Sequence, residues 1–225
     1  MSQSDLQAVL EQIKPVSEEQ LAAIQSRIDR QAKPVGSLGR LEEFARRFVA
    51  ITGKEKVGGK RIYAFAGDHG ITEEGVSAFP QEVTPQMVFN LVDGGASVNA
   101  LARHAGAEVR VVDMGVATDF ENLAGLIERK IAKGTANFAK GPAMSHEQAL
   151  QALLTGIEMA RQAKADGIDL VGTGEMGIGN TTPSAAIAAC ICHLPIEQVT
   201  HRGTGIDDEG LARKIVAISK GLAVN

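Results

Sequence analysis

The stretch GIDLVGTGEMGIGNTTPSAAIAACIC, residues 167–192, decides the fold because it passes from strand to glycine-rich turn to helix. Residues 167–174 are mostly apolar and are bounded by glycines, which predicts a buried strand. Pro183 is expected at the first helical position, where its missing N–H costs nothing. Strand, turn and helix in this order are the repeating unit of an α/β protein with a mostly parallel sheet.

The same alternation extends outward along the chain. We predict three more strands, at 61–67, 108–115 and 129–138, and helices at 84–91, 96–104, 145–167 and 207–220. We therefore expect an α/β fold with a mostly parallel, Rossmann-like sheet flanked by helices. Residues 1–55 are rich in helical periodicity and predict the helical part of a small N-terminal subdomain. Residues 56–225 then form an α/β nucleotide-binding domain.

Composition narrows the classes of function. The 23 Lys and Arg against 27 Asp and Glu give a net charge of −4, which argues against nucleic-acid binding. No apolar run approaches the roughly 20 residues that span a bilayer, and the polar N-terminus is unlike a signal peptide. The only cysteines, Cys190 and Cys192, are interpreted as small core residues. These features favour a cytoplasmic protein without a membrane segment.

The glycine-rich turn predicts an anion site. Glycines at 172, 174, 177 and 179 let backbone N–H groups approach a ligand, and the following helix adds partial positive charge. A turn that needs glycine only for its shape is the alternative. Two nucleotide templates also fit in part: a dinucleotide fingerprint with Glu197 as its acidic residue, and a P-loop in which Asn180 stands at the lysine position. The missing lysine favours a nucleoside monophosphate over a triphosphate.

The end of the strand at 61–67 carries a second polar group. Asp68 and His69 there could form a metal pair, an acid–base pair or a hydrogen-bonded brace. The polar loop 73–84 follows and holds one aromatic residue, so it could close over a flat apolar ring. The acidic residues form no convincing metal cluster, and His104, His146, His193 and His201 show no metal-ligand spacing, so we predict no metal site and no cofactor. A magnesium ion near Asp68 and Glu175 stays open as the alternative.

Four motifs in order and spacing carry a resemblance to a known family. They are KPVGSLGRLE (33–42), FAGDHGITEEGVSAFPQEVT (65–84), GTGEMGIGNTTPSAA (172–186) and GTGIDDEGLARK (203–214). Together they resemble the nicotinate-nucleotide–dimethylbenzimidazole phosphoribosyltransferases of cobalamin lower-ligand synthesis. The resemblance implies transfer of the phosphoribosyl group of nicotinate mononucleotide to 5,6-dimethylbenzimidazole, which gives α-ribazole 5′-phosphate and nicotinate. It also implies a homodimer.

The resemblance assigns roles to individual residues. Glu175 lies near the reacting groups, where a carboxylate would stabilise an oxocarbenium-like transition state. A benzimidazole pocket is lined by Ser77, Phe79 and Gln86, and Asp68 and His69 support the site. The phosphate is held by the following residues: Gly174, Met176, Gly177, Ile178, Gly179, Asn180 and Lys214.

The chain departs from the family in one respect. The glutamate usually assigned as general base stands in an arginine-leucine-glycine-glutamate-glycine context that these 225 residues do not contain. We interpret the chain as truncated, and expect little turnover while phosphate binding survives. Two other hypotheses stay open: a non-catalytic mononucleotide-binding module, and an NAD-dependent oxidoreductase that rests on the G-x-G-x-x-G spacing alone.

Overall fold

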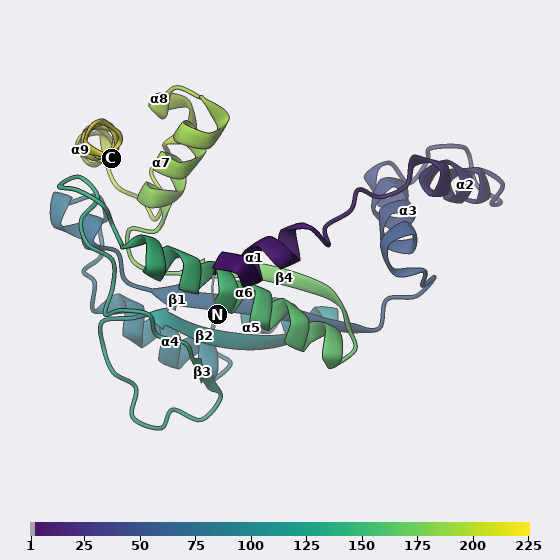
Figure 1. Ribbon diagram of the computed structural model, residues 1–225, viewed down its shortest axis with the longest axis horizontal. Coiled ribbons are helices and arrows are strands. Elements are labelled where there is room, and N and C mark those ends of the chain that lie inside the picture. Colours follow the sequence, from purple (N-terminus) through teal and green to yellow (C-terminus); the bar gives the residue numbers. More distant parts are fainter. Residues whose placement is uncertain (1–2) are drawn as a thin grey trace.

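A four-stranded parallel sheet organises the computed structural model, which describes residues 3–225 (Figure 1). The strand order is β3-β2-β1-β4. The strands are β1 (Gly59–Gly67), β2 (Glu108–Gly115), β3 (Leu126–Glu128) and β4 (Ile168–Met176). Every neighbouring pair runs parallel. The predicted α/β class with a parallel sheet is thus confirmed.

Helices cover both faces of this sheet (Figure 1). On one face, α4 and α5 pack over Ala64, Ala66 and Val111. On the other face, α6 packs over Tyr63 and Val112 through Met159 and Ala163. The helices of the chain are α1 (Gln3–Leu10), α2 (Glu18–Asp29), α3 (Arg40–Thr52), the 3-10 helix η1 (Gly70–Glu74), α4 (Val83–Val92), α5 (Ser97–Ala105), α6 (His146–Ala165), α7 (Thr181–Cys192), α8 (Ile196–Val199) and α9 (Asp208–Val224).

Local signals place most helix ends where the sequence predicts them. Ser145 and Gln148 form the capping box of α6, and Gly106 ends α5 with a positive φ of 63°. Asp207 caps α9 by accepting from the Gly210 N–H at 2.7 Å. Pro183 is a correction, because α7 begins at Thr181 and the proline is its third residue. It is still in the first turn, where its lack of an N–H is harmless.

The strand predicted at 129–138 is wrong. The strand at the edge of the sheet is β3, at 126–128, and the chain then continues as an irregular loop. Its N–H groups still bond to the end of β2, from Ile131 to Met114 O and from Gly134 to Gly115 O. Gly134 has a φ of 82°, which turns the chain over the end of β2 instead of along it.

Two expectations of burial are also wrong. Residues 170–175 of β4 are exposed, because β4 is the second edge strand of the sheet, opposite β3. Cys190 and Cys192 are exposed on α7, whose outer face also carries Ile187 and Ile191. An apolar sequence predicts that a segment can be buried, but the packing around it decides whether it is.

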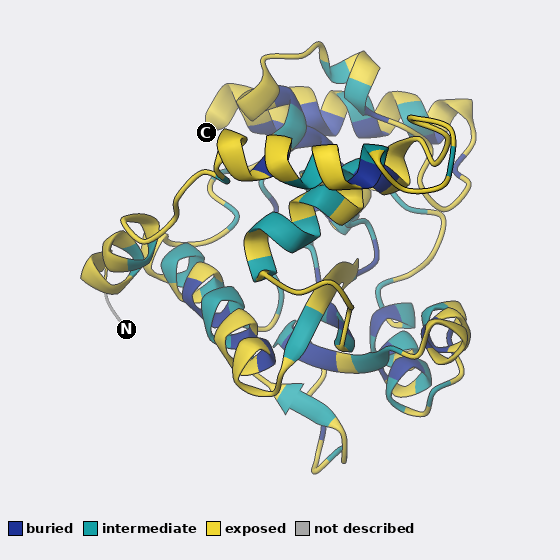
Figure 2. Ribbon diagram, turned by 90° about the vertical axis from the view of Figure 1, so that its right-hand side faces the viewer, coloured by how far each residue is buried: buried dark blue, intermediate teal, exposed yellow. Residues whose placement is uncertain are grey.

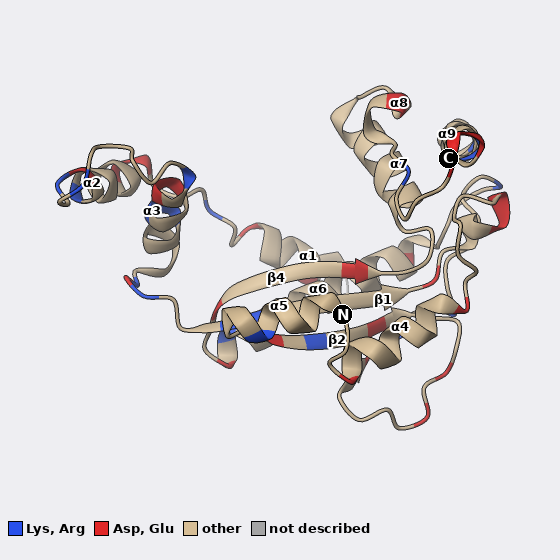
Figure 3. Ribbon diagram, turned by 180° about the vertical axis from the view of Figure 1, so that it is seen from behind, with Lys and Arg blue, Asp and Glu red and all other residues tan. Residues whose placement is uncertain are grey.

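The helices α2 and α3 stand apart from the sheet, and residues 53–58 connect them to it (Figure 1). In the side view of Figure 2 much of this pair is exposed, and both signs of charge occur on it in Figure 3. Lys33 and Glu42, the first and last residues of the motif 33–42, form a 2.7 Å ion pair that braces the loop between the helices. In contrast, α1 lies against α6. The domain boundary near residue 55 stays a prediction.

No helix among residues 3–225 combines the length and the apolar character that crossing a bilayer requires.

Candidate functional site

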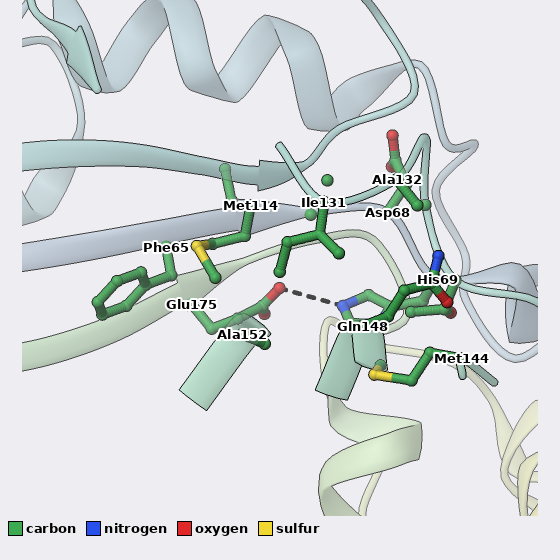
Figure 4. Close-up of a pocket in the computed structure, with 15 residues that line it drawn as sticks. Phe65, Asp68, His69, Met114, Ile131, Ala132, Met144, Gln148, Ala152 and Glu175 are labelled. Atoms are coloured by element: carbon green, nitrogen blue, oxygen red, sulfur yellow. Dashed lines mark hydrogen bonds and ion pairs between the residues drawn. The ribbon is translucent and has the colours of Figure 1, made fainter. Parts of the chain in front are cut away.

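The carboxyl ends of β1, β2 and β4 meet at one edge of the sheet. Gly67 of β1 lies beside Gly115 of β2, and Ala66 lies beside Met176 of β4. A cavity of about 200 Å³ opens there, and Figure 4 shows the residues that line it. Ligands of open parallel sheets bind at this edge, so the cavity is a candidate ligand-binding site.

The walls of this cavity are mainly apolar, with a few polar groups. The apolar side chains come from two strands and from the loop after β3, and the polar ones from three strand or helix ends. The main contributors are Phe65, Met114, Ile131, Met144, His69, Gln148 and Glu175. Met144, Ile131 and Gln148 escaped the sequence analysis, because nothing in their local sequence distinguishes them from ordinary loop and helix residues.

Glu175 and His69 contact each other at the rim. The His69 Nε2 lies 3.0 Å from Glu175 Oε1, a contact drawn as a dashed line in Figure 4. The other carboxylate oxygen, Oε2, accepts a hydrogen bond from Asn180 Nδ2. Three predicted site residues are therefore in direct contact, although His69 and Glu175 are 106 positions apart in sequence.

Asp68 acts as a brace next to them. It is buried, and its Oδ2 accepts from the Ala117 N–H at 2.8 Å. Its backbone oxygen accepts from the Thr135 N–H at 3.0 Å. Asp68 thus ties the end of β1 to the loops that follow β2 and β3. Of the three interpretations of the Asp68–His69 pair, these contacts favour the hydrogen-bonded brace for Asp68.

The glycine-rich turn is shorter than its sequence indicates. β4 runs through Met176, so Gly174 and Met176 belong to the strand, and the turn comprises residues 177–180. The Ile178 N–H donates to Thr84 Oγ1 at 3.1 Å, and the Asn180 N–H donates to Gly177 O at 3.0 Å. These two N–H groups already have partners within the protein.

Two glycines of this turn are required by close packing. A Cβ at Gly177 would lie 2.1 Å from Gly67 O, 2.6 Å from Glu175 Oε1 and 2.7 Å from His69 Nε2. Gly179 has a φ of 83°, and a Cβ there would lie 3.0 Å from a methyl group of Thr72. The turn therefore needs glycine to fit against the end of β1, whatever else it binds.

Lys214 reaches this turn from α9. Its Nζ donates to Thr181 Oγ1 at 2.5 Å and to His201 O at 3.0 Å, and the side chain is only 1% exposed. Burial lowers the pKa of Lys214. No ion pair to Lys214 occurs within residues 3–225. A buried ammonium group at the first turn of α7 is an arrangement that favours an anionic ligand.

A second, larger groove adjoins the first. It has a volume of about 520 Å³ and runs between α7, the end of α9 and the loop around Phe138. Both hollows are lined by His69, Thr135, Met144 and Glu175. The Glu175–His69 pair therefore lies where the two meet.

Ser77, Phe79 and Gln86 lie on the segment between η1 and the first turns of α4. Ser77 Oγ accepts from the Phe79 N–H at 3.2 Å, and the Phe79 and Gln86 side chains are exposed. None of the three lines either hollow described above. Their assignment to a ring-binding pocket stays a prediction. Within residues 3–225 no three acidic, histidine or cysteine side chains are grouped as a metal site would require.

Comparison with known proteins gives consistent similarities. A family model described as a phosphoribosyltransferase matches residues 13–225. The chain is 62% identical over 222 residues to a protein of Geotalea uraniireducens, covering 98% of this chain and 63% of that protein. It is 61% identical, with the same coverage, to one of Geobacter sulfurreducens. Both are named nicotinate-nucleotide–dimethylbenzimidazole phosphoribosyltransferase.

Solved structures agree with this result. The crystal structure of CobT from Thermus thermophilus superposes with a TM-score of 0.86 at 47% identity, covering 91% of this chain and 62% of that one. The chain thus spans somewhat less than two-thirds of the length of these relatives.

Proposed function

The chain belongs to this phosphoribosyltransferase family, and we propose that its site moves the phosphoribosyl group of nicotinate mononucleotide to 5,6-dimethylbenzimidazole. The products are α-ribazole 5′-phosphate and nicotinate, an intermediate and a by-product of cobalamin lower-ligand synthesis. The observation that carries the proposal is the placement of the Glu175 carboxylate at the rim of an apolar cavity, on the segment that leads into the glycine turn and α7.

The phosphate of the nucleotide is assigned to the start of α7. Asn180 and Thr181 begin the helix, and the buried Lys214 supplies a positive charge. A helix N-terminus and a desolvated ammonium group both favour a phosphate. The Ile178 and Asn180 N–H groups, which bond within the protein, shape the turn 177–180, and Lys214 neutralises the ligand.

The reaction exchanges one C–N bond for another. The bond from C1′ of the ribose to the nicotinate nitrogen breaks, and its electron pair leaves with nicotinate. An azole nitrogen of dimethylbenzimidazole then bonds to C1′ with inversion, and the proton on the other azole nitrogen passes to a base. Positive charge develops on the ribose as the first bond breaks, and Glu175 stabilises it electrostatically.

A non-catalytic mononucleotide-binding role is the second candidate. It is favoured by the same turn and lysine, which serve binding without any chemistry. We further infer a cytoplasmic homodimer that does not bind nucleic acid, in keeping with the net charge of −4 and the exposed apolar side chains of α3.

Incubation of the purified chain with nicotinate mononucleotide and dimethylbenzimidazole tests the proposal. Calorimetry should detect binding of the nucleotide, and chromatography should detect α-ribazole phosphate at a low rate. Binding without any product would be shared by the non-catalytic role and by an enzyme whose catalytic base lies outside these 225 residues. The absence of both nucleotide binding and product would refute both candidates.

A further inference from the structure

The Glu175 carboxylate is held on both of its oxygens by side chains from two other segments. His69, two residues after the end of β1, contacts Oε1 at 3.0 Å, and Asn180, at the start of α7, donates to Oε2. Glu175 itself ends the exposed edge of β4, and its side chain is 40% exposed. A glutamate so exposed would ordinarily sample several rotamers. The two contacts restrict the Glu175 side chain to one orientation.

The backbone of His69 is held by the 3-10 helix that follows it. Its backbone oxygen accepts from the Thr72 N–H at 3.1 Å and from Thr72 Oγ1 at 2.9 Å. Its side chain is 17% exposed and borders both hollows of the site. The backbone from which the imidazole reaches Glu175 is therefore fixed, and the largely buried ring places its Nε2 3.0 Å from Oε1.

The neighbouring turn leaves room for this contact. A Cβ at Gly177 would come within 2.7 Å of both Glu175 Oε1 and His69 Nε2. The glycine thus allows the imidazole and the carboxylate to meet at hydrogen-bonding distance over the turn.

We propose that His69 is a positioning residue, whose Nε2–H donates to Glu175 Oε1 and, with Asn180, fixes the carboxylate toward the reacting sugar. This inference rests on the proposed function, which needs a carboxylate at a set distance from C1′. A carboxylate that accepts from two fixed donors keeps its place while charge develops on the ribose, and a misplaced group loses much of its effect.

Two substitutions of matched polarity separate positioning from folding. In His69→Gln the amide nitrogen can occupy the place of Nε2 and donate to Glu175, whereas in His69→Asn the shorter side chain cannot reach it. In the product-formation assay we expect His69→Asn to lower kcat by about tenfold to a hundredfold with a small change in KM. His69→Gln should recover most of that loss.

A double-mutant cycle identifies Glu175 as the partner. In a Glu175→Ala background the further change His69→Asn should cost less than about twofold in kcat, because the group to be positioned is already absent. Equal losses in both backgrounds, or equal losses for His69→Gln and His69→Asn, would overturn the proposal.

A second measurement needs no turnover. Nitrogen-15 spectra of the histidine side chains should show His69 as the Nε2–H tautomer at neutral pH, with a slowly exchanging ring proton. In Glu175→Ala that proton should exchange rapidly and the tautomers should mix. Identical His69 signals in the two proteins would overturn the proposal, whether or not the wild-type chain forms product. Absence of product by itself would count only against the proposed function.

Discussion

Lys214 has an environment that is unusual for a lysine. It is almost fully buried, its Nζ bonds to two neutral oxygens, and burial lowers its pKa. A buried cation without a counter-charge costs free energy, and a bound phosphate would recover it. Function and stability are therefore expected to oppose each other at this position.

Lys214→Met tests that opposition. The neutral side chain should leave the melting temperature unchanged or raise it, because desolvation of the charge is removed. The Kd for nicotinate mononucleotide should rise by about tenfold or more, since a charge-assisted hydrogen bond contributes roughly 1.5–3 kcal/mol. Calorimetry and thermal unfolding measure the two effects. Lys220→Met on the same helix is the control, because Lys220 is exposed and should leave the Kd unchanged. Unaltered affinity in Lys214→Met would contradict the phosphate role.

Gly177 is the second position that local packing dominates. Gly177→Ala should destabilise the fold by about 1–3 kcal/mol, because the added methyl group overlaps Gly67 O and separates His69 from Glu175. Urea unfolding measures the change. Gly174→Ala is the matched control, since a Cβ there meets nothing within 4 Å. Equal stability of the two variants would show that the turn is looser than the structure indicates.

At the scale of elements, α9 matters because it carries Lys214 to the start of α7. Asp207 begins this helix and accepts from the Gly210 N–H. Asp207→Ala should cost about 1 kcal/mol of unfolding free energy, whereas Asp207→Asn, which keeps a capping oxygen, should cost much less. Urea unfolding of the two variants checks this. A similar loss in both would mean that the negative charge, and not the cap, is what stabilises the helix.

β4 is also the element that joins the sheet to the N-terminal helices. Asp169 accepts from Lys54 Nζ at 2.5 Å and from the Gly58 N–H at 2.7 Å, just after α3 ends. The hydrogen bond from Lys54, followed by that from Gly58, lowers the pKa of Asp169. The ionised form therefore stabilises the junction.

This junction predicts a dependence on pH. Because the folded-state pKa of Asp169 lies below its unfolded value, its contribution is complete above the unfolded value and is lost as the pH falls through the folded one. Asp169→Asn should thus have a lower urea midpoint than wild type at about pH 7. The gap should close as the medium becomes strongly acidic. If the difference in urea midpoint between the two proteins stayed constant down to about pH 2, ionisation of the Asp169 carboxylate would be excluded as its cause.

At the scale of the whole molecule, the helices α2 and α3 leave apolar side chains uncovered. Leu41, Phe44 and Ile51 of α3 are all exposed, and Figure 2 shows this side of the molecule. Exposed apolar groups gathered on one element are typical of a surface that binds another protein. The proposed homodimer would bury such a surface.

Phe44→Glu tests the dimer. A buried, unpaired carboxylate would oppose association, so sedimentation should find monomers where the wild-type chain forms dimers. Leu101→Glu on α5 is the control, because Leu101 is exposed and lies on a different helix. A wild-type chain that sediments as a monomer, or a Phe44→Glu variant that remains dimeric, would contradict the role of this surface.

Sequence alone determined the features that depend on local physics. Apolar runs bounded by glycine predicted β1, β2 and β4, and side-chain caps predicted the starts of α6 and α9. The strand predicted at 129–138 failed because its path depends on how the chain turns at Gly134 over the end of β2. Local sequence cannot supply that contact.

The features of the candidate site also fall into those that the sequence indicated and those that only the tertiary structure decided. Four motifs indicated the family, and the glycine turn indicated an anion site, because both depend on the order of residues along the chain. Only the tertiary structure decided that β4 is an exposed edge, that Lys214 is buried beside Thr181, and that His69 meets Glu175. These are contacts between residues tens of positions apart, and their geometry follows from how the helices and strands pack against one another.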